Sequence, residues 1–345
     1  MLFNIWVTTK CNMNCRYCYE KQQKNDKIMD QNIAQKIISF INTSVKKKEM
    51  DEPIIINFHG GEPLLNFGII KYITNSIRQM LEKRKLYFGV TTNGTLLNDE
   101  IIDFLCDNFS YSLSISIDGY KEVNDYNRIL FNGQGVHNLI IHHIEKLLEK
   151  SNDVRARMTF TSETVKYLYD SVNYLYNLGF KVIVPVADYF DSHWNHESIQ
   201  CLAKELEKIY AQFPFSKRVK EDLVLGLIRD NNVRFKNGLC DPKNCAVNIN
   251  YDGLLYPCSY VVNDENYAIG DVVTGIEMEK LEFIYTLSKA ANEECSGCTN
   301  YDYCVSTRCK LMNKVMTGDF NKASPVFCNI ENIVLEYADK YYLLG

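Results

Sequence analysis

Thirteen cysteines stand out in this chain of 345 residues. Eleven of them fall into two groups, an N-terminal triad and a set in the last third, whereas Cys106 and Cys201 stand alone on helix-like segments. The number is odd and no signal peptide precedes the first strand-like run, so a secreted disulfide framework is not expected. The grouping therefore predicts that these thiols bind a metal ion or an iron–sulfur cluster.

The N-terminal triad is Cys11, Cys15 and Cys18, in the segment TTKCNMNCRYCYE. A structural zinc site usually takes four ligands in two pairs, whereas this triad is one compact unit with no fourth cysteine nearby. Three thiolates on a [4Fe–4S] cluster leave one iron open to a small substrate. The spacing thus favours a cluster with an open iron.

The triad, with Tyr17 before its third cysteine, resembles the signature of the radical S-adenosylmethionine (radical SAM) superfamily. Further motifs that resemble the family are the run from Gly60 to Pro63 (GGEP), the TNG at 92–94 and the SISIDG at 114–119. The resemblance implies SAM-binding residues at Tyr17, Gly60, Gly61, Glu62, Pro63, Asn93, Ser116, Arg128 and Thr161. It assigns GGEP to the methionine amino group of SAM and Ser116 and Arg128 to the carboxylate, for which a hydroxyl and a guanidinium are good partners.

The cysteines of the last third resemble the SPASM extension of radical SAM peptide and protein maturases. The pattern runs C-x12-G-x4-C, then C-x2-C-x5-C, then two more cysteines, and it departs from the family because four residues, not three, separate Cys304 from Cys309. The ligands that the resemblance implies are Cys240, Cys245, Cys258 and Cys309 for one auxiliary cluster and Cys295, Cys298, Cys304 and Cys328 for the other. The expected cofactors are therefore three [4Fe–4S] clusters and SAM.

Alternating strand-like and helix-like segments must position these residues. The strands are expected at Phe3–Thr9, Ile54–Phe58, Tyr87–Thr92, Tyr111–Ile117, Val154–Thr161 and Lys181–Ala187. Apolar residues at helical spacing fill 30–46, 68–83, 98–107, 135–149, 163–178 and 196–212, with Asp30, Asn98 and Ser162 as N-caps and Gly179 as a helix end. Six βα units predict a parallel α/β fold, a partial (β/α)6 TIM-like barrel with its polar loops at the carboxyl ends of the strands.

The expected domains are a radical SAM barrel at 1–212, a bridging segment at 213–239 and a SPASM domain with a C-terminal helix at 240–345. The formal net charge of −5 and the lack of a basic tract argue against nucleic-acid binding. No apolar run approaches the roughly 20 residues that span a bilayer, so no membrane partner is expected. The expected location is the cytoplasm.

The resemblance implies that the chain cleaves SAM reductively and that a 5′-deoxyadenosyl radical removes a hydrogen atom from a substrate. We expect a ribosomally made, small, cysteine-containing peptide as substrate, with a thioether or related crosslink as product. An external electron donor such as flavodoxin or ferredoxin and a separate leader-binding protein are the expected partners.

Three alternatives stay open. A sulfatase-maturase-like oxidase would form formylglycine, but Ser259 stands where those relatives carry a basic Asp, leaving Asp188, Asp191 or Asp264 to substitute. A peptide epimerase would use Cys106 or Cys201 as a hydrogen-atom donor. A binding protein with structural zinc sites would use cysteine pairs such as the CSGC at 295–298. The sequence assigns no catalytic residue for any of these functions.

Overall fold

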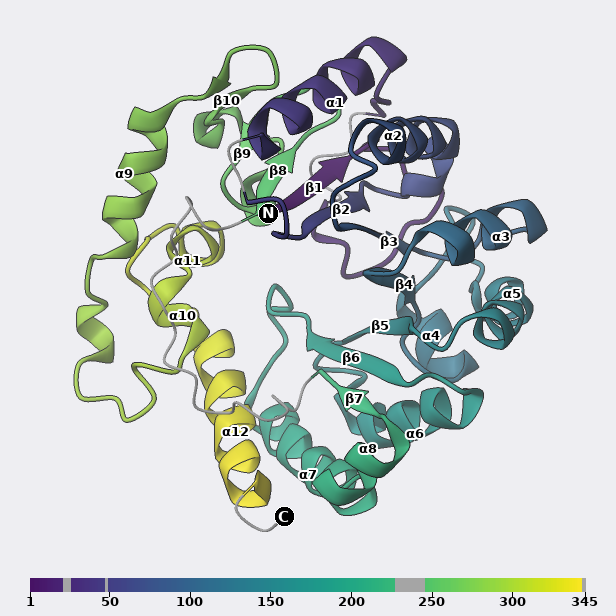
Figure 1. Ribbon diagram of the computed structural model, residues 1–345. Coiled ribbons are helices and arrows are strands. Elements are labelled where there is room, and N and C mark those ends of the chain that lie inside the picture. The colour runs from purple at the N-terminus through teal and green to yellow at the C-terminus, as the bar shows by residue number, and fades with distance from the viewer. Residues whose placement is uncertain (21–25, 47–48, 227–245, 343–345) are drawn as a thin grey trace. The chain divides into compact units, whose positions relative to one another are not determined.

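A computed structural model describes residues 1–20, 26–46, 49–226 and 246–342 (Figure 1). The chain forms two compact units, each assembled from separate stretches. The first comprises Met1–Asn12, Glu20–Leu113 and Leu239–Ala290, and the second comprises Met13–Tyr19, Ser114–Gly238 and Ala291–Gly345. Both units have the parallel α/β pattern that the alternation predicts, and all six predicted strands are present.

The strands of the first unit lie in the order β3-β2-β1-β8-β9. They are β1 (Leu2–Trp6), β2 (Ile54–His59), β3 (Leu86–Thr92), β8 (Val247–Ile249) and β9 (Leu255–Tyr256). β1 pairs in parallel with both neighbours, so that Phe3 lies opposite Ile56 on one side and Val247 on the other. Phe3 and Ile56 are fully buried. A short antiparallel pair follows, β10 (Gly270–Asp271) and β11 (Gly275–Ile276).

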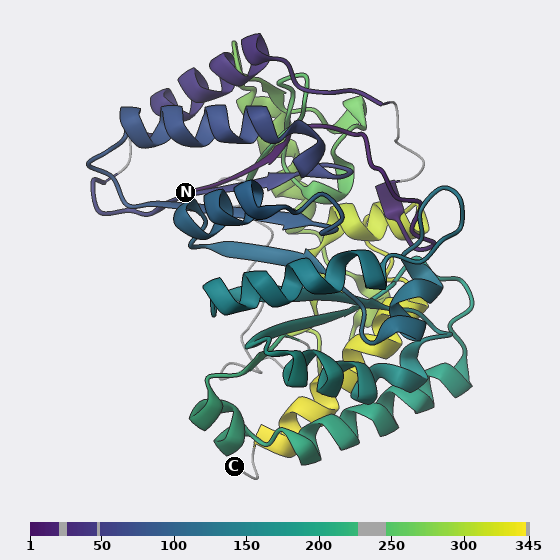
Figure 2. The same ribbon diagram turned by 90° about the vertical axis from the view of Figure 1, so that its right-hand side faces the viewer.

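The helices of the first unit are α1 (Gln31–Val45), α2 (Phe67–Met80), α3 (Asp99–Asn108) and α9 (Met278–Ser288). α1 buries Ile37, Ile41 and Val45 at steps of four, as the periodicity predicts, and α1 and α2 run side by side (Figure 2). The predicted N-caps are confirmed because the side chains of Asp30 and Asn98 accept backbone hydrogen bonds in the first turns of α1 and α3.

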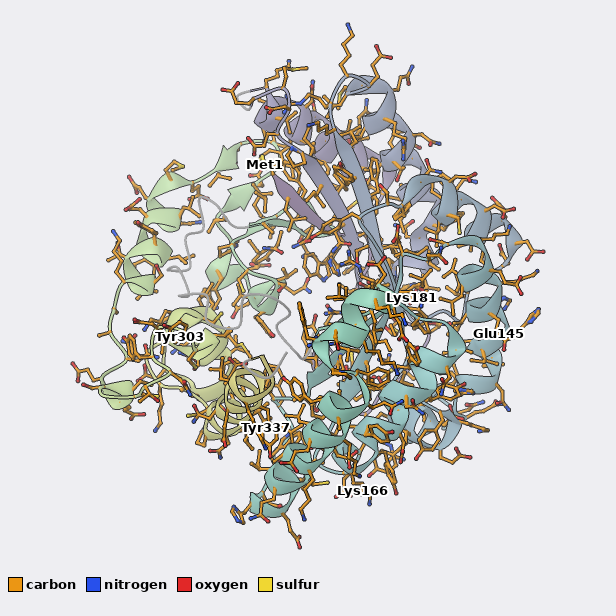
Figure 3. The ribbon with its side chains drawn as sticks, turned by 60° about the horizontal axis from the view of Figure 1, so that its bottom comes forward. Met1, Glu145, Lys166, Lys181, Tyr303 and Tyr337 are labelled. Carbon is orange, nitrogen blue, oxygen red and sulfur yellow. The ribbon has the colours of Figure 1, made fainter. Side chains whose placement is uncertain are left out.

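The second unit places its strands in the order β7-β6-β5-β4. They are β4 (Ser112–Ser116), β5 (Val154–Phe160), β6 (Val182–Ala187) and β7 (Val224–Leu225). Its helices are α4 (Lys121–Asn127), α5 (His137–Lys150), α6 (Leu168–Leu178), α7 (His196–Gln212), α8 (Phe215–Glu221), α10 (Val305–Arg308), α11 (Lys310–Thr317) and α12 (Pro325–Tyr342). The C-terminal helix α12 packs on α7, where Tyr337 (labelled in Figure 3) donates a hydrogen bond to Glu207 at 3.2 Å.

Three local features differ from the sequence-based expectations. Ser162 is not an N-cap, because a 3₁₀ turn at Val165–Tyr167 comes first and α6 begins only at Leu168. α4 was not predicted, and the described part of the bridging segment contains α8 and β7, which are too short to show periodicity.

The predicted helix end at Gly179 is confirmed by its left-handed backbone, with φ of 112°. No helix among the described residues has the length and hydropathy needed to cross a membrane.

Candidate functional site

The loop after β1 carries Cys11, whose sulfur receives a hydrogen bond from the protein. Nδ2 of Asn93 lies 3.9 Å from Sγ of Cys11 and donates also to Oδ1 of Asn12 at 2.9 Å. Oδ1 of Asn93 accepts from N and Oγ1 of Thr95, at 3.0 and 2.6 Å, which fixes the orientation of the amide. An amide N–H that faces sulfur favours the thiolate, the form that ligates iron. The structure thus places Asn93 beside the first cysteine of the triad.

Two glycines hold this loop against the end of β2. The N–H groups of Gly61 and Glu62 donate to the carbonyl oxygens of Thr8 and Lys10, at 3.1 and 2.7 Å. A Cβ on Gly60 would lie 2.5 Å from the carbonyl oxygen of Thr8, and one on Gly61 would collide with that of Lys10. Gly60 also has a φ of 154°, which side chains rarely adopt. The GGEP run therefore fixes the backbone that leads into Cys11.

The carboxylate of Glu62 is fully buried and satisfied by the chain itself. Oε1 accepts from Leu64 N (3.1 Å) and Thr92 Oγ1 (2.6 Å), and Oε2 accepts from Asn93 N (2.7 Å). Burial raises the pKa of Glu62 to about 7, although these hydrogen bonds oppose the shift. Glu62 thus ties the turn that begins at Pro63 to the end of β3, and its contact with the amino group of SAM stays a prediction.

A buried ion pair organises the end of β4 in the second unit. Oδ1 of Asp118 accepts from the guanidinium of Arg128 and from Thr159 N, both at 2.8 Å, and Oδ2 accepts from the hydroxyl of Tyr17 at 2.8 Å. The guanidinium lies 5.3 Å from the centre of the Tyr17 ring. Burial raises the pKa of the Asp118 carboxyl, and the positive charge of Arg128 opposes this shift. Burial lowers the pKa of the Arg128 guanidinium, but the negative charge of Asp118 outweighs it, so that the pKa of Arg128 is raised. Ser116 is half-buried two residues earlier.

The second half of the triad is fastened to the segment that contains Arg128. The backbone N–H groups of Asn14 and Arg16, on either side of Cys15, donate to carbonyl oxygens in 127–129 at 2.8 and 2.9 Å. Nε of Arg128 is buried, and no acceptor in the described part of the chain hydrogen-bonds it. A buried donor without an acceptor is costly, so this nitrogen fits an absent acceptor such as the carboxylate of SAM.

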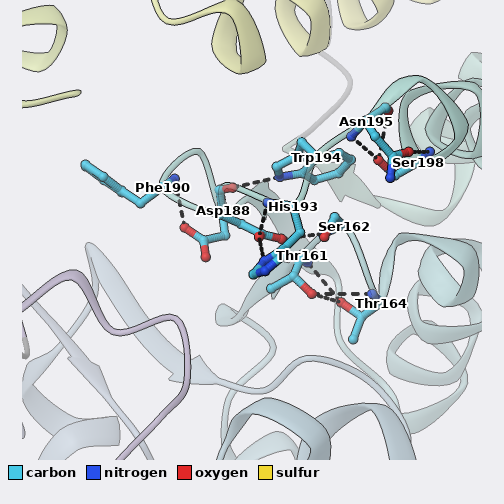
Figure 4. A network of polar contacts seen from close by, with 10 residues as sticks. Thr161, Ser162, Thr164, Asp188, Phe190, His193, Trp194, Asn195 and Ser198 are labelled. Atoms are coloured by element: carbon cyan, nitrogen blue, oxygen red, sulfur yellow. Dashed lines mark hydrogen bonds and ion pairs between the residues drawn. The ribbon is translucent and has the colours of Figure 1, made fainter. Parts of the chain in front are cut away.

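The loops after β5 and β6 share a polar network in the second unit (Figure 4). Thr161 N donates to Oγ1 of Thr164 at 2.9 Å, and the two hydroxyl oxygens lie 3.2 Å apart. Oδ2 of Asp191 accepts from Ser162 N (2.9 Å), and its Oδ1 accepts from N and Nδ1 of His193 (2.9 and 3.0 Å). The carboxylate of Asp191 therefore joins the two loops.

Asp188, the first residue after β6, carries a half-buried carboxylate in the same network. Its backbone N–H donates to Phe160 O (2.8 Å), its carbonyl accepts from Nε1 of Trp194 (2.9 Å), and its Oδ1 accepts from Phe190 N (3.0 Å). In the described part of the chain Asp188 forms no ion pair. Burial raises its pKa to about 6, and the charge of Asp191 adds to the shift. A carboxylate with this pKa can exchange a proton near neutral pH.

Four cysteines of the last third interact electrostatically in the second unit: Cys295, Cys298, Cys304 and Cys328. Burial raises the pKa of Cys304 to about 11. It also raises the pKa of Cys295 and Cys328, and the charge of a neighbouring thiolate adds to each shift. Thiols in this arrangement become thiolates readily only when a metal or cluster supplies positive charge.

Hydrogen-bond donors surround these sulfurs. Nδ2 of Asn332 lies 3.6 Å from Sγ of Cys328, the side chain of Asn292 hydrogen-bonds Cys295, and two backbone N–H groups of α10 donate to Cys304. N–H groups aimed at sulfur tune iron–sulfur clusters. The donor set of four thiols with N–H partners fits a cluster.

The other predicted ligands are placed as follows. Cys258 precedes a 3₁₀ turn at Ser259–Val261 in the first unit, with Ser259 exposed, and Cys309 precedes α11 in the second. Cys240 and Cys245 lie outside the described residues. Within the described part of the chain, no three His, Cys, Asp or Glu side chains are gathered as for a single metal ion.

The two remaining cysteines lie on helices. Cys106 is half-buried on α3 and Cys201 is half-buried on α7, where burial raises the pKa of its thiol. Among the other expected acids, Asp264 accepts hydrogen bonds from N and Nδ2 of Asn266.

A family model described as the radical SAM superfamily matches residues 5–188. The chain belongs to this superfamily. A relative that matches most of the chain is the cysteine-type anaerobic sulfatase-maturating enzyme of Clostridium novyi. It is 23% identical over 324 residues, which cover 87% of this chain and 85% of the relative. An uncharacterized protein of Methanocaldococcus jannaschii, MJ0907, is 32% identical over 177 residues, or 51% of this chain, and the match spans 59% of that relative.

Two solved structures resemble this fold. The sulfatase-maturating enzyme anSMEcpe with bound AdoMet and the Cp18Cys peptide matches with a TM-score of 0.80 and 20% identity, over 99% of this chain and 98% of that one. SuiB of Streptococcus suis, bound to its precursor peptide SuiA, matches with a TM-score of 0.67 and 13% identity, over 94% and 75%. The predicted fold class, a partial α/β barrel with a cysteine-rich C-terminal region, is therefore confirmed.

Sequence analysis missed some residues that the structure brings to the site of this radical SAM protein. Asp118 lies within the SISIDG motif, ten residues before Arg128, and this spacing was the available signal. Asn292 and Asn332 gave no signal, because only the fold brings them to sulfur.

Proposed function

We propose that this chain is a radical SAM peptide maturase that forms a thioether, or a related crosslink, in a small cysteine-containing precursor peptide. The observation that carries the choice of product is Ser259. It stands exposed directly after Cys258, at the position where sulfatase maturases carry a basic carboxylate. A serine hydroxyl cannot act as a general base at neutral pH. Precursor-peptide binding by SuiB, a fold relative, supports the same substrate class.

The first cluster and SAM would be held by residues whose surroundings suit them. Cys11, Cys15 and Cys18 would ligate the cluster, and Nε of Arg128 would bind the carboxylate of SAM while Asp118 holds the guanidinium in place. When bound, the cluster and SAM supply the removal of a hydrogen atom from the substrate. The remaining predicted SAM contacts are those at Tyr17, Gly60, Gly61, Glu62, Pro63, Asn93, Ser116 and Thr161.

The auxiliary clusters complete the proposal. Cys295, Cys298, Cys304 and Cys328 would hold one, supported by the N–H donors around them, and Cys240, Cys245, Cys258 and Cys309 would hold the other. We retain the domain boundaries 1–212, 213–239 and 240–345, an external electron donor, a separate leader-binding protein and a cytoplasmic location as parts of the proposal.

A second candidate function is the oxidation of a cysteine to formylglycine, as in the sulfatase-maturating relatives. Asp188 favours it, because this half-buried carboxylate at the end of β6 has a pKa near 6 and pairs with no cation among the described residues. In that reaction Asp188 would accept the proton that the substrate releases, in the place of the missing carboxylate at Ser259.

The mass of the product decides between these functions. The protein would be co-expressed anaerobically with a cysteine-containing precursor peptide encoded beside it, or with the Cp18Cys peptide added to lysate. Loss of two hydrogens with the cysteine no longer alkylatable supports a thioether, whereas loss of two hydrogens with an alkylatable thiol indicates a carbon–carbon link. Conversion of the cysteine to an aldehyde supports formylglycine instead. A gain of one deuterium in heavy water without other change indicates epimerisation and brings in Cys106 or Cys201.

The control is Cys15→Ala, which removes a proposed ligand of the first cluster, against Cys106→Ala, which leaves the triad intact. Modification that survives Cys15→Ala contradicts the proposal. Metal analysis of the purified protein separates the non-enzyme alternative, because zinc without iron and sulfide would mean a zinc-stapled protein.

A further inference from the structure

Lys310 is a buried lysine whose hydrogen-bond acceptors among the described residues are neutral. It begins α11 and is 3% exposed. Its ammonium donates hydrogen bonds to Oδ1 of Asn292 and, at 2.9 Å, to Oδ1 of Asn321. Both acceptors are neutral amides, and among the described residues no carboxylate forms an ion pair with Lys310. The carboxylate of Asp319 interacts electrostatically with this ammonium without forming an ion pair. A buried charge that lacks a direct counter-charge is costly, so the fold favours a further negative group nearby.

The second negative group near Lys310, besides Asp319, is the four-cysteine group defined by Cys295, Cys298, Cys304 and Cys328. Cys295 is the member that interacts electrostatically with the Lys310 ammonium. The two are also linked through Asn292, whose Oδ1 accepts from Lys310 while its side chain hydrogen-bonds Cys295. Thiolates around an iron–sulfur cluster carry net negative charge, which increases on reduction.

We propose that Lys310 is the counter-charge of the iron–sulfur cluster held by this four-cysteine group and that it raises the reduction potential of that cluster. The inference rests on the proposed function and deepens it. A fixed positive charge stabilises the reduced state, because that state is the more negative one. Lys310 also orients Asn292 toward Cys295, and an N–H donor to sulfur acts in the same direction. Lys310 is thus a positioning residue that tunes the cluster electrostatically.

The chain offers a matched control one turn later on the same helix. Lys314 donates to the carbonyl oxygen of Gly318 at 2.6 Å in an exposed contact, and its ammonium lies over the ring of Phe320. Lys314→Met therefore removes a lysine from α11 without removing the buried charge. Lys310→Arg keeps the charge, and Asn321→Asp keeps Lys310 while placing a neutralising carboxylate against its ammonium.

The test is a redox titration of the anaerobic, iron-loaded, full-length protein, followed by electron paramagnetic resonance. The signal that changes on addition of SAM belongs to the first cluster, and the signal lost in Cys328→Ala identifies the cluster of the four-cysteine group. We expect Lys310→Met and Asn321→Asp to shift downward the midpoint potential of the cluster held by the four-cysteine group. Lys310→Arg should stay near the wild-type potential, and Lys314→Met should leave every potential unchanged.

Unchanged potentials in the iron-loaded Lys310→Met and Asn321→Asp proteins would overturn the inference, as would an equal shift in Lys314→Met. Should Lys310→Met fail to load iron, Asn321→Asp alone decides, because it alters no buried volume. A wild-type protein that contains zinc and no sulfide would instead refute the proposed function, which separates the two failures.

Discussion

Glu62 makes a prediction whose sign changes with pH. Glu62→Gln keeps the shape of the side chain but replaces one carboxylate oxygen with an NH₂ group. The smallest loss places that NH₂ opposite Asn93 N. This leaves the N–H of Asn93 and the N–H groups of the new amide without acceptors and costs at least about 1–3 kcal/mol. The wild-type protein has a cost of its own, because burial raises the pKa of the Glu62 carboxyl from 4.5 to about 7. Ionising this carboxyl therefore costs about 3 kcal/mol more in the folded protein than in the unfolded chain.

The sign follows from the raised pKa. The stabilisation that comes from the protonated wild-type carboxyl is present at low pH and is lost as the pH rises through about 7. Roughly 1 kcal/mol of this loss falls between pH 6 and pH 8. Glu62→Gln has no such group, so we expect it to be less stable than wild type at pH 6 and to approach or exceed wild-type stability at pH 8.

Denaturant unfolding of the iron-loaded protein checks this, and the chain supplies the probe. Its two tryptophans are Trp6, buried in the same unit as Glu62, and Trp194 in the other unit. In a Trp194→Phe background the fluorescence of Trp6 reports the unit that contains Glu62. A stability difference between Glu62→Gln and its parent that stays constant from pH 6 to pH 8 would refute the reasoning.

Three further predictions concern single side chains. Arg128→Lys keeps the positive charge opposite the buried carboxylate of Asp118 but removes Nε. We expect SAM to bind this variant at least about 10-fold more weakly in equilibrium dialysis with the iron-loaded protein. Unaltered binding would mean that the carboxylate of SAM binds elsewhere. In the wild type, product formation should rise through about pH 6, because the Asp188 carboxyl becomes an effective base only above its raised pKa, and Asp188→Asn should abolish this rise. Rates of product formation measured by mass spectrometry over pH 5.5–8 check this. A variant whose pH profile is identical to that of the wild type would exclude Asp188 as a base. Gly61→Ala should destabilise the protein by about 1–3 kcal/mol in denaturant unfolding, because its Cβ meets the Lys10 carbonyl, whereas the control Gly68→Ala, with open space around it, should be neutral or stabilising.

Local pattern predicted the elements that obey it. The step-of-four apolar face of α1 and the caps at Asp30 and Asn98 came directly from the sequence, because each depends on residues within one or two turns. Ser162 was mistaken for a cap because the segment after β5 begins with a 3₁₀ turn, in which the hydroxyl that accepts a backbone N–H is that of Thr161. Two adjacent hydroxyl residues give the same local signal, so periodicity could not choose between them.

The same distinction holds for the site. The motif around Gly60 and Gly61 could be recognised in the sequence, but its physical basis, two backbone hydrogen bonds to the segment before Cys11, required the structure. The role of Lys310 was invisible, because its partners Asn292 and Asn321 come from loops on either side of it in the chain. Buried polar contacts between distant segments are thus the part that sequence reasoning could not supply.

The position of β1 has a consequence for how the chain folds. β1 lies between β2 and β8, and Trp6 at its end packs in one apolar cluster with Tyr256 and Val262. During synthesis the first strand is made about 240 residues before β8, so one of its edges waits unpaired while most of the chain is translated. Pairing over such a sequence distance is slow, because the loop-closure entropy is lost before the contact forms. The loop that carries Cys11 therefore reaches its final support late, and a chain truncated before residue 247 would keep an open, aggregation-prone edge beside its first cysteine.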